Sequence, residues 1–100
     1  NILFTQCLAE KLSQSKLTAN ALHPGVISTK LLHKGFSIKG ASVKNGAKTP
    51  VYLAISNKVA QINGKYFVSC VQKPASRNAT NEKTATDLWN ISNRRLEQFL

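Results

Sequence analysis

The chain has 100 residues and a formal net charge of +10, with 42% hydrophobic residues and only four acidic ones. This length allows one small domain at most, and the composition is that of an ordinary globular protein. No stretch approaches the run of about 18 apolar residues that a membrane helix needs, and no basic segment of a secretory signal precedes the first apolar residues. Cys7 and Cys70 form neither a C-x-x-C motif nor a metal cluster, so they are expected to be free thiols in a reducing cytoplasm.

Residues 2–13 are predicted to form a helix, because apolar side chains recur at i, i+4 and i+8 from Phe4. Since the chain begins inside this pattern without a methionine, we expect it to start within a helix of a longer protein. Residues 17–23 form a short uncharged run before Pro24-Gly25, which favours a strand buried on both faces of a sheet. A helix followed closely by such a strand is typical of a βαβ crossover and predicts a parallel sheet.

A long connection, residues 24–41, follows, and its middle from Leu31 to Ile38 is predicted to be a short amphipathic helix on a mobile loop. Ser42 is expected to cap a helix through about Ser56. Pro50 lies inside that helix, where proline costs roughly 3 kcal/mol relative to alanine. It therefore predicts either a kink or a late effective start.

The last third of the chain predicts one strand and one helix. Asn63-Gly64 indicates a turn, and a strand is expected from Tyr66 to about Cys70. Residues 72–80 are predicted to be a polar connection, before a helix that Thr80 or Asn81 caps and that ends near Phe99. Two strands alone cannot make a stable sheet with helical cover, which supports the interpretation as part of a larger domain.

Positive charge is concentrated between Glu10 and Glu82, because this interval holds eleven Lys and Arg residues and no acidic residue. Such a surface attracts a phosphate-bearing cofactor, nucleic acid or an acidic surface. One alternative is a solvated surface whose acidic counterpart lies elsewhere. Another is a basic module that binds nucleic acid or a different polyanion, although aromatic residues do not alternate with the lysines as in single-strand binders. Five lysines are close together in sequence: Lys30, Lys34, Lys39, Lys44 and Lys48.

A ligand site is predicted just after the strand at 17–23, because ligands of open α/β sheets bind beyond the carboxyl ends of strands. Pro24 and Gly25 turn the chain there and leave little side chain in the way. Backbone N–H groups at Val26 and Ile27 would then face a ligand, and Thr29 offers a hydroxyl that donates and accepts. On spacing alone, Pro-Gly after a strand is usually just an ordinary turn.

The same region resembles a known family. The run Asn20-Ala-Leu-His-Pro-Gly-Val-Ile-Ser-Thr-Lys-Leu-Leu32 closely resembles the segment after the sixth strand of short-chain dehydrogenases/reductases. Residues 1–12 resemble the rest of the helix that begins with the family's Tyr-x-x-x-Lys motif. Three later runs resemble the helix after the substrate loop, the last strand, and the terminal helix of retinol-dehydrogenase-like or carbonyl-reductase-like members: Gly46–Ala54, Gly64–Phe67 and Ala85–Ser92.

The resemblance implies an α/β fold, namely the C-terminal part of a Rossmann-type doubly wound parallel sheet, truncated before the dinucleotide-binding half and forming with it a single domain. It implies NAD or NADP as cofactor of the parent enzyme and a carbonyl or alcohol as substrate. Pro24 and Gly25 would shape the nicotinamide end of the site, the Ile27 backbone would bind the carboxamide, and the Thr29 hydroxyl would bind the carboxamide or the diphosphate. Residues of the next segment would form the lid over the substrate: Leu31, Leu32 and Phe36.

No catalytic residue is expected within residues 1–100, since the family's catalytic Tyr and Lys would lie upstream of Asn1. Neither Tyr52 nor Tyr66 has a Lys four residues on, so both are expected to be packing residues. No G-x-G-x-x-G motif is present, and His23, expected to be half-buried and hydrogen-bonded, belongs to no metal-ligand pattern. The chain alone should therefore be inactive. A homodimer through the first helix is an alternative to packing of that helix on the parent sheet, which we favour.

Overall fold

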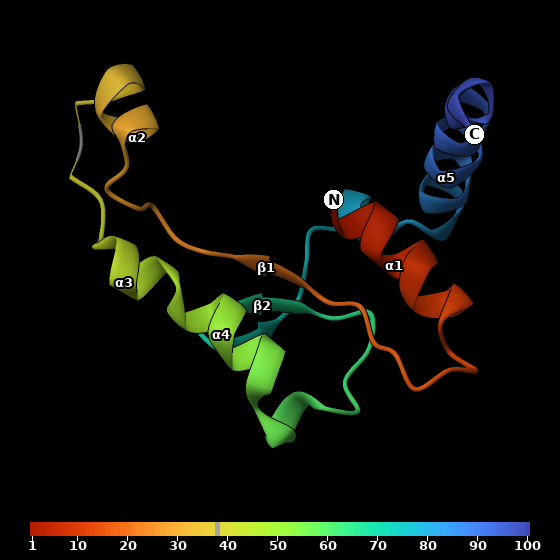
Figure 1. The fold of residues 1–100 in the computed structure, drawn as a ribbon, viewed down its shortest axis with the longest axis horizontal. Helices are drawn as coiled ribbons and strands as arrows, with labels where there is room; N and C mark the ends of the chain where they lie inside the picture. Colours follow the sequence, from red (N-terminus) through yellow and green to blue (C-terminus); the bar gives the residue numbers. More distant parts are fainter. Residues whose placement is uncertain (38) are drawn as a thin grey trace.

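A three-stranded mixed sheet lies in the middle of the computed structural model, which describes residues 1–37 and 39–100. In Figure 1, α1 and α5 lie at one end of the molecule and α2 and α3 at the other, with the sheet and α4 between them. The helices are α1 (Ile2–Lys11), α2 (Lys30–Gly35), α3 (Val43–Gly46), α4 (Lys48–Ile55) and α5 (Glu82–Leu96), and the strands are β1 (Ala21–His23), β2 (Tyr66–Val68) and β3 (Val71–Lys73). Short 3-10 turns are formed by Asn57–Val59, Asn78–Thr80 and Glu97–Phe99.

The predicted parallel pairing is confirmed, because β1 pairs in parallel with β2 from Ala21↔Tyr66 to His23↔Val68. β3 (Val71–Lys73) was not expected, since Gln72 and Lys73 belong to the start of the predicted polar connection. It pairs antiparallel with β2 because Ser69 and Cys70 have φ values of 50° and 61°, and two such residues in succession form a tight hairpin turn. The sheet order is β1-β2-β3, so β1 is at an edge.

β1 is shorter than the predicted strand at 17–23 and is not buried on both faces. The Ala19 carbonyl accepts a hydrogen bond from the Gly64 N–H (2.8 Å), and the Ala19 N–H donates to Asn63 Oδ1 (2.9 Å). These backbone groups are therefore paired with a turn instead of a strand ladder. His23 at the other end of β1 is exposed, so the expectation that it is half-buried was wrong.

Two asparagine side chains hold the start of β1 against the segment before β2. Asn20 donates from Nδ2 to the Ile62 carbonyl (2.7 Å) and accepts at Oδ1 from the Lys65 N–H (2.9 Å). Asn63 accepts from Ala19 and also donates from Nδ2 to the Ala9 carbonyl in α1 (2.8 Å). Because each amide uses both its donor and its acceptor, the two residues fix the relative position of α1, β1 and β2.

The helix predicted from Ser42 to Ser56 is divided into α3 and α4. Ser42 caps α3 as expected, with its Oγ accepting from the Asn45 N–H at 3.2 Å. Pro50 is the third residue of α4, where backbone N–H groups have no intrahelical partner, so its missing donor costs no helix hydrogen bond. The late effective start is thus the correct one of the two predictions for Pro50.

The contact between α1 and α5 forms one part of a thin core. The Phe4 and Trp89 rings stack with centroids 5.3 Å apart, and Lys11 Nζ lies 5.0 Å from the Trp89 ring centroid. On α5, Ala85 is buried and Trp89 and Ser92 are half-buried, whereas Leu88 and Leu96 are exposed. The buried hydrophobic residues are Cys7, Ala9, Val59, Phe67 and Ala85.

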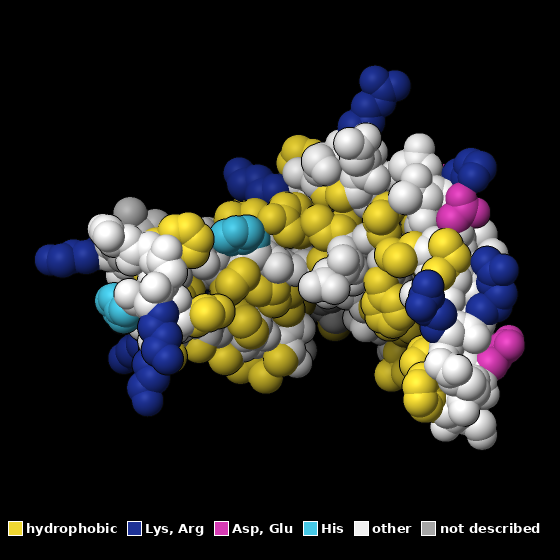
Figure 2. All heavy atoms as spheres, turned by 90° about the horizontal axis from the view of Figure 1, so that it is seen from above, with side chains coloured by type: hydrophobic (Ala, Val, Ile, Leu, Met, Phe, Trp, Pro, Cys, Tyr) yellow, Lys and Arg dark blue, Asp and Glu magenta, His cyan; other side chains and the backbone are white. Residues whose placement is uncertain are grey.

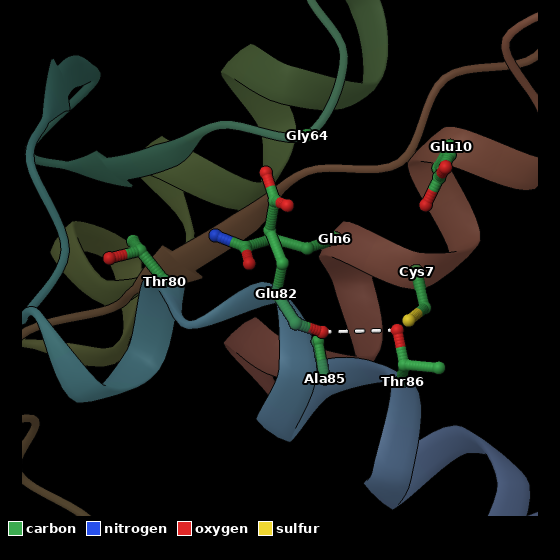
Figure 3. A pocket seen from close by; sticks show the side chains of 8 residues that line it. All are labelled: Gln6, Cys7, Glu10, Gly64, Thr80, Glu82, Ala85 and Thr86. Carbon is green, nitrogen blue, oxygen red and sulfur yellow. Dashed lines mark hydrogen bonds between the residues drawn. The ribbon is translucent and has the colours of Figure 1, made fainter.

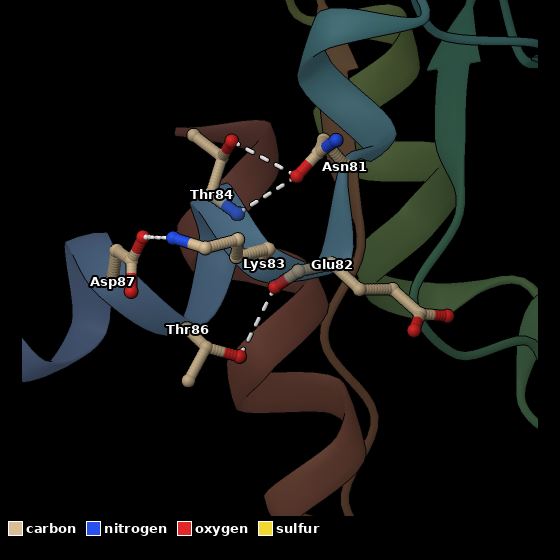
Figure 4. Close-up of polar contacts among 6 residues, drawn as sticks. All are labelled: Asn81, Glu82, Lys83, Thr84, Thr86 and Asp87. Carbon is tan, nitrogen blue, oxygen red and sulfur yellow. Dashed lines mark hydrogen bonds and ion pairs between the residues drawn. The ribbon is translucent and has the colours of Figure 1, made fainter.

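The start of α5 is set by Asn81, one of the two predicted caps (Figure 4). Asn81 Oδ1 accepts from both the backbone N–H and the hydroxyl of Thr84, each at 2.9 Å. In the first turn of α5, Lys83 Nζ lies 2.6 Å from Asp87 Oδ2. This hydrogen bond, together with the Asp87 charge, raises the pKa of the Lys83 ammonium. The pair is exposed to solvent, so it contributes little to stability.

In the part of the chain that the structure describes, no helix has both the length and the apolar character needed to cross a membrane. Many hydrophobic side chains nevertheless reach the surface. Figure 2 shows a broad hydrophobic area in the middle of the face seen from above, between the two ends of the molecule.

Candidate functional site

A cleft lies beyond the carboxyl ends of β1 and β2. Because these strands are parallel, the turns that follow them, Pro24-Gly25 and Ser69-Cys70, meet at the same edge of the sheet. The cleft has a volume of about 340 Å³. Its lining combines residues from both turns, from the loop before α3 and from α4: Pro24, Gly25, Ile27, Ala41, Asn45, Lys48, Thr49, Ser69 and Cys70.

The turn after β1 depends on a glycine and a histidine. Gly25 has a φ of +90°, a conformation that residues with a side chain rarely adopt. Its N–H donates to Nδ1 of the exposed His23 at 2.8 Å, which confirms that His23 has a hydrogen-bond partner. The bond fixes the direction in which the chain leaves the sheet and brings Ile27 to the wall of the cleft.

Ile27 is held by a parallel bridge to Ala41. The Ala41 N–H donates to the Val26 carbonyl (2.8 Å), and the Ser28 N–H donates to the Ala41 carbonyl (2.7 Å). In a parallel ladder this pattern directs the N–H and carbonyl of the middle residue, Ile27, away from its partner strand. A Cβ on the neighbouring Gly40 would lie 2.5 Å from the Ile27 carbonyl carbon, so the bridge requires glycine there.

The other wall of the cleft is formed by Thr49 and Cys70, which the sequence did not indicate. Thr49 is only 5% exposed, and its Oγ1 accepts from the Cys70 N–H at 3.1 Å. The same oxygen lies 3.7 Å from Cys70 Sγ. Both cysteines of the chain are free, as expected. Lys48 adds the only cationic side chain among the cleft-lining residues, so the cleft combines apolar, hydroxyl and ammonium groups.

Of the four predicted cofactor residues, the structure brings three together. Pro24, Gly25 and Ile27 line the cleft, whereas Thr29 does not. Thr29 is exposed and caps α2, with its Oγ1 accepting from the Leu32 N–H at 3.3 Å. Its hydroxyl proton remains available to donate, since capping uses only the oxygen as acceptor.

The predicted lid residues do not cover the cleft. The short helix expected at 31–38 is present as α2, although Ile38 lies outside the described residues. Leu31 and Phe36 are 80% and 66% exposed, and Leu32 is half-buried. Figure 1 shows that α2 lies at the end of a segment that extends away from the sheet. A lid role for these residues therefore stays a prediction.

A second cavity, of about 470 Å³, lies between α1 and α5 (Figure 3). Glu10 and the buried Cys7 line it from α1, and Glu82 lines it from α5. In residues 1–37 and 39–100, no group of three or more His, Cys, Asp or Glu side chains is placed to hold a metal ion. Tyr52 and Tyr66 are both half-buried, in agreement with the packing role expected for them.

Comparison with known proteins gives a consistent set of relatives, although no protein-family model matches the chain. The chain is 38% identical over 101 residues to retinol dehydrogenase 12 of Mus musculus and 35% identical over 105 residues to retinol dehydrogenase 14 of Homo sapiens, in each case over 92% of its own length. It is 32% identical over 110 residues, and over its full length, to the WW domain-containing oxidoreductase of Gallus gallus. The matched part is 32%, 31% and 27% of these relatives, respectively, so the chain spans about a third of their length or less.

Proposed function

Because the chain belongs to the short-chain dehydrogenase/reductase family, we propose that residues 1–100 are the C-terminal part of an NAD(P)-dependent oxidoreductase domain. The observation that carries this proposal is the cleft beyond the carboxyl ends of two parallel strands, lined by the Pro24–Ile27 turn. Ligands of open α/β sheets bind at this edge. The relatives are named as dehydrogenases and an oxidoreductase, which supports the same class of reaction.

The residues of the cleft fit the nicotinamide end of a dinucleotide. The Ile27 N–H points away from its bridge partner, and Gly25 leaves space beside it, so a carboxamide oxygen could accept from this backbone group. A second proposed contact to the cofactor is made by the Thr29 hydroxyl at the start of α2, which would bind the carboxamide or the diphosphate. NAD(P) supplies the hydride chemistry when bound, and the protein orients it. In this role the chain's residues select the ring face that is presented.

The substrate is proposed to be a carbonyl or alcohol, and the two relatives named retinol dehydrogenase favour a lipophilic alcohol or aldehyde. Leu31, Leu32 and Phe36 would contact it if α2 closes over the cleft. The catalytic Tyr and Lys are proposed to lie in sequence that precedes Asn1. Residues 1–100 alone should then neither bind dinucleotide tightly nor turn over substrate.

The experiment is a chimera in which residues 1–100 replace the matching segment of mouse retinol dehydrogenase 12, called the chimera below. We expect the chimera to oxidise NADPH or NADH with a carbonyl substrate, and the isolated 100 residues to show no turnover. Thr29→Ala in the chimera should weaken cofactor binding by a factor of about 3–10, the value of one neutral hydrogen bond.

Thr18→Ala is the matched control, because Thr18 is exposed and lies before β1, away from the cleft. It should leave cofactor affinity unchanged. A folded chimera that binds no dinucleotide would contradict the proposed function. Equal affinities of the chimera and its Thr29→Ala variant would contradict the role of Thr29 alone.

A further inference from the structure

The segment that carries α2 and α3 projects from the sheet and is here called the arm, residues 29–37 and 39–46 (Figure 1). Three of the large apolar side chains in its described residues are turned to solvent. Leu31, Phe36 and Val43 are 80%, 66% and 65% exposed. None of the three lines the cleft described above, so these apolar side chains are exposed to solvent outside it.

The arm is also uniformly basic. Lys30, Lys34, Lys39 and Lys44 are all exposed, and no acidic residue occurs between Glu10 and Glu82. In Figure 2 basic side chains project from the end of the molecule that carries the arm, while the acidic side chains visible on this face lie at the opposite end. The combination is that of an element that lies on an anionic lipid surface, where lysines meet headgroups and apolar side chains enter the boundary layer.

We propose that the arm docks on the surface of a membrane that contains anionic lipid, with Leu31 and Phe36 inserted at the headgroup boundary. The lysine stems can lie along that boundary while their ammonium groups reach the lipid phosphates. Three exposed apolar side chains favour lipid over nucleic acid, because single-strand binding relies on aromatic stacking platforms and Phe36 is the only aromatic residue of the arm. The cofactor plays no part in this inference, but Leu31 and Phe36 are also the residues proposed above for the substrate lid.

The test is co-sedimentation of residues 1–100 with phosphatidylcholine vesicles, with or without about 30% phosphatidylserine. We expect binding only when phosphatidylserine is present. Lys30→Gln/Lys34→Gln should weaken binding roughly tenfold, since each lysine near such a surface contributes to the attraction. Leu31→Ser/Phe36→Ser should weaken it at least as much. All four side chains are exposed or end in solvent, so these changes leave the fold intact.

Matched controls distinguish docking by the arm from non-specific binding of the chain to vesicles. Val51→Ser/Ile55→Ser removes two side chains of α4 that are 50% and 76% exposed, and Lys58→Gln/Lys65→Gln removes two exposed charges outside the arm. Both control variants should bind vesicles nearly as the parent chain does. If either control loses as much binding as its counterpart in the arm, the proposal is overturned.

A fluorescence measurement locates the contact. Trp89 is the only tryptophan and packs on Phe4 between α1 and α5, remote from the arm. Brominated lipid should therefore leave Trp89 emission nearly unchanged, but should quench a tryptophan introduced by Phe36→Trp in a Trp89→Phe background. Failure to quench that tryptophan overturns the proposal. A second result would also overturn it: an oligonucleotide abolishes vesicle binding, while the Leu31→Ser/Phe36→Ser variant still binds vesicles. That result would indicate a nucleic-acid surface.

Discussion

At the scale of single residues, the cleft depends on the buried hydroxyl of Thr49. Thr49 is buried, and its Oγ1 is the acceptor for the N–H of Cys70, a residue whose φ of 61° lies in the left-handed region that residues with a side chain rarely adopt. The bond joins α4 to the hairpin after β2, and so it holds together the wall of the cleft that Thr49 and Cys70 form. A buried N–H without a partner costs its full desolvation free energy.

We therefore expect Thr49→Val to lower the free energy of unfolding of the chimera by about 1–3 kcal/mol, because valine keeps the shape and removes the acceptor. Urea unfolding followed by circular dichroism measures the change. Thr49→Ser keeps a hydroxyl and should restore part of the lost stability. Thr18→Val, at an exposed position, should have no effect; equal losses for Thr18→Val and Thr49→Val would show that the hydroxyl contact is not the cause.

Only part of the cleft could be predicted from the sequence. Pro24, Gly25 and Ile27 could be assigned because they come directly after a strand, and the rule for carboxyl ends of parallel strands needs no tertiary detail. Thr49 and Cys70 could not, because they meet only through the packing of α4 beside the β2–β3 hairpin, 21 residues apart in sequence. No local pattern marks such a pair. The same holds for Lys48, whose position in the cleft follows from the late start of α4.

At the scale of elements, local signals predicted helices better than strands. The caps Ser42 and Asn81 were correct because each is a short-range interaction with the third residue after it. β3 was missed because its three residues are all exposed and two of them, Gln72 and Lys73, are polar; only the positive φ values at Ser69 and Cys70 turn it back onto β2. Residues 17–20 were wrongly included in β1, since the side chains of Asn20 and Asn63 take over the hydrogen bonding there.

The cap of α5 gives an element-scale prediction. Asn81→Ala should lower the free energy of unfolding of the chimera by about 1 kcal/mol, because the N–H of Thr84 loses its acceptor at the helix start. Asn90→Ala is the matched control within the same helix: Asn90 is exposed, and alanine has the higher helix propensity. It should be neutral or slightly stabilising. Thermal unfolding of the two variants side by side measures the difference, and a loss at position 90 equal to that at 81 would contradict the capping role.

At the scale of the whole molecule, the chain buries little of its surface. A folded monomer of 10.9 kDa is expected to expose about 5,600 Å², whereas this chain exposes 8005 Å². The radius of gyration is 15.8 Å, compared with about 13 Å for a compact chain of 100 residues. Large apolar side chains contribute to the exposed surface, since Leu31, Ile55 and Phe99 are each at least 76% exposed. The edge of β1 has no partner strand in the part of the chain that the structure describes. These are the properties of a surface that further strands and helices would cover.

We therefore expect residues 1–100 alone to unfold over a broad range of urea concentration and to bind the dye ANS, because exposed apolar side chains offer sites for it and the small core gives little cooperativity. The chimera should unfold in a sharper transition, with a larger m-value and little ANS binding, since the preceding segment of retinol dehydrogenase 12 supplies the cover. The comparison uses one set of residues in two contexts, so the chain's own sequence is held constant. A sharp two-state transition without ANS binding for the isolated chain would contradict this expectation, and it would also remove the main physical reason for placing residues 1–100 in a larger sheet.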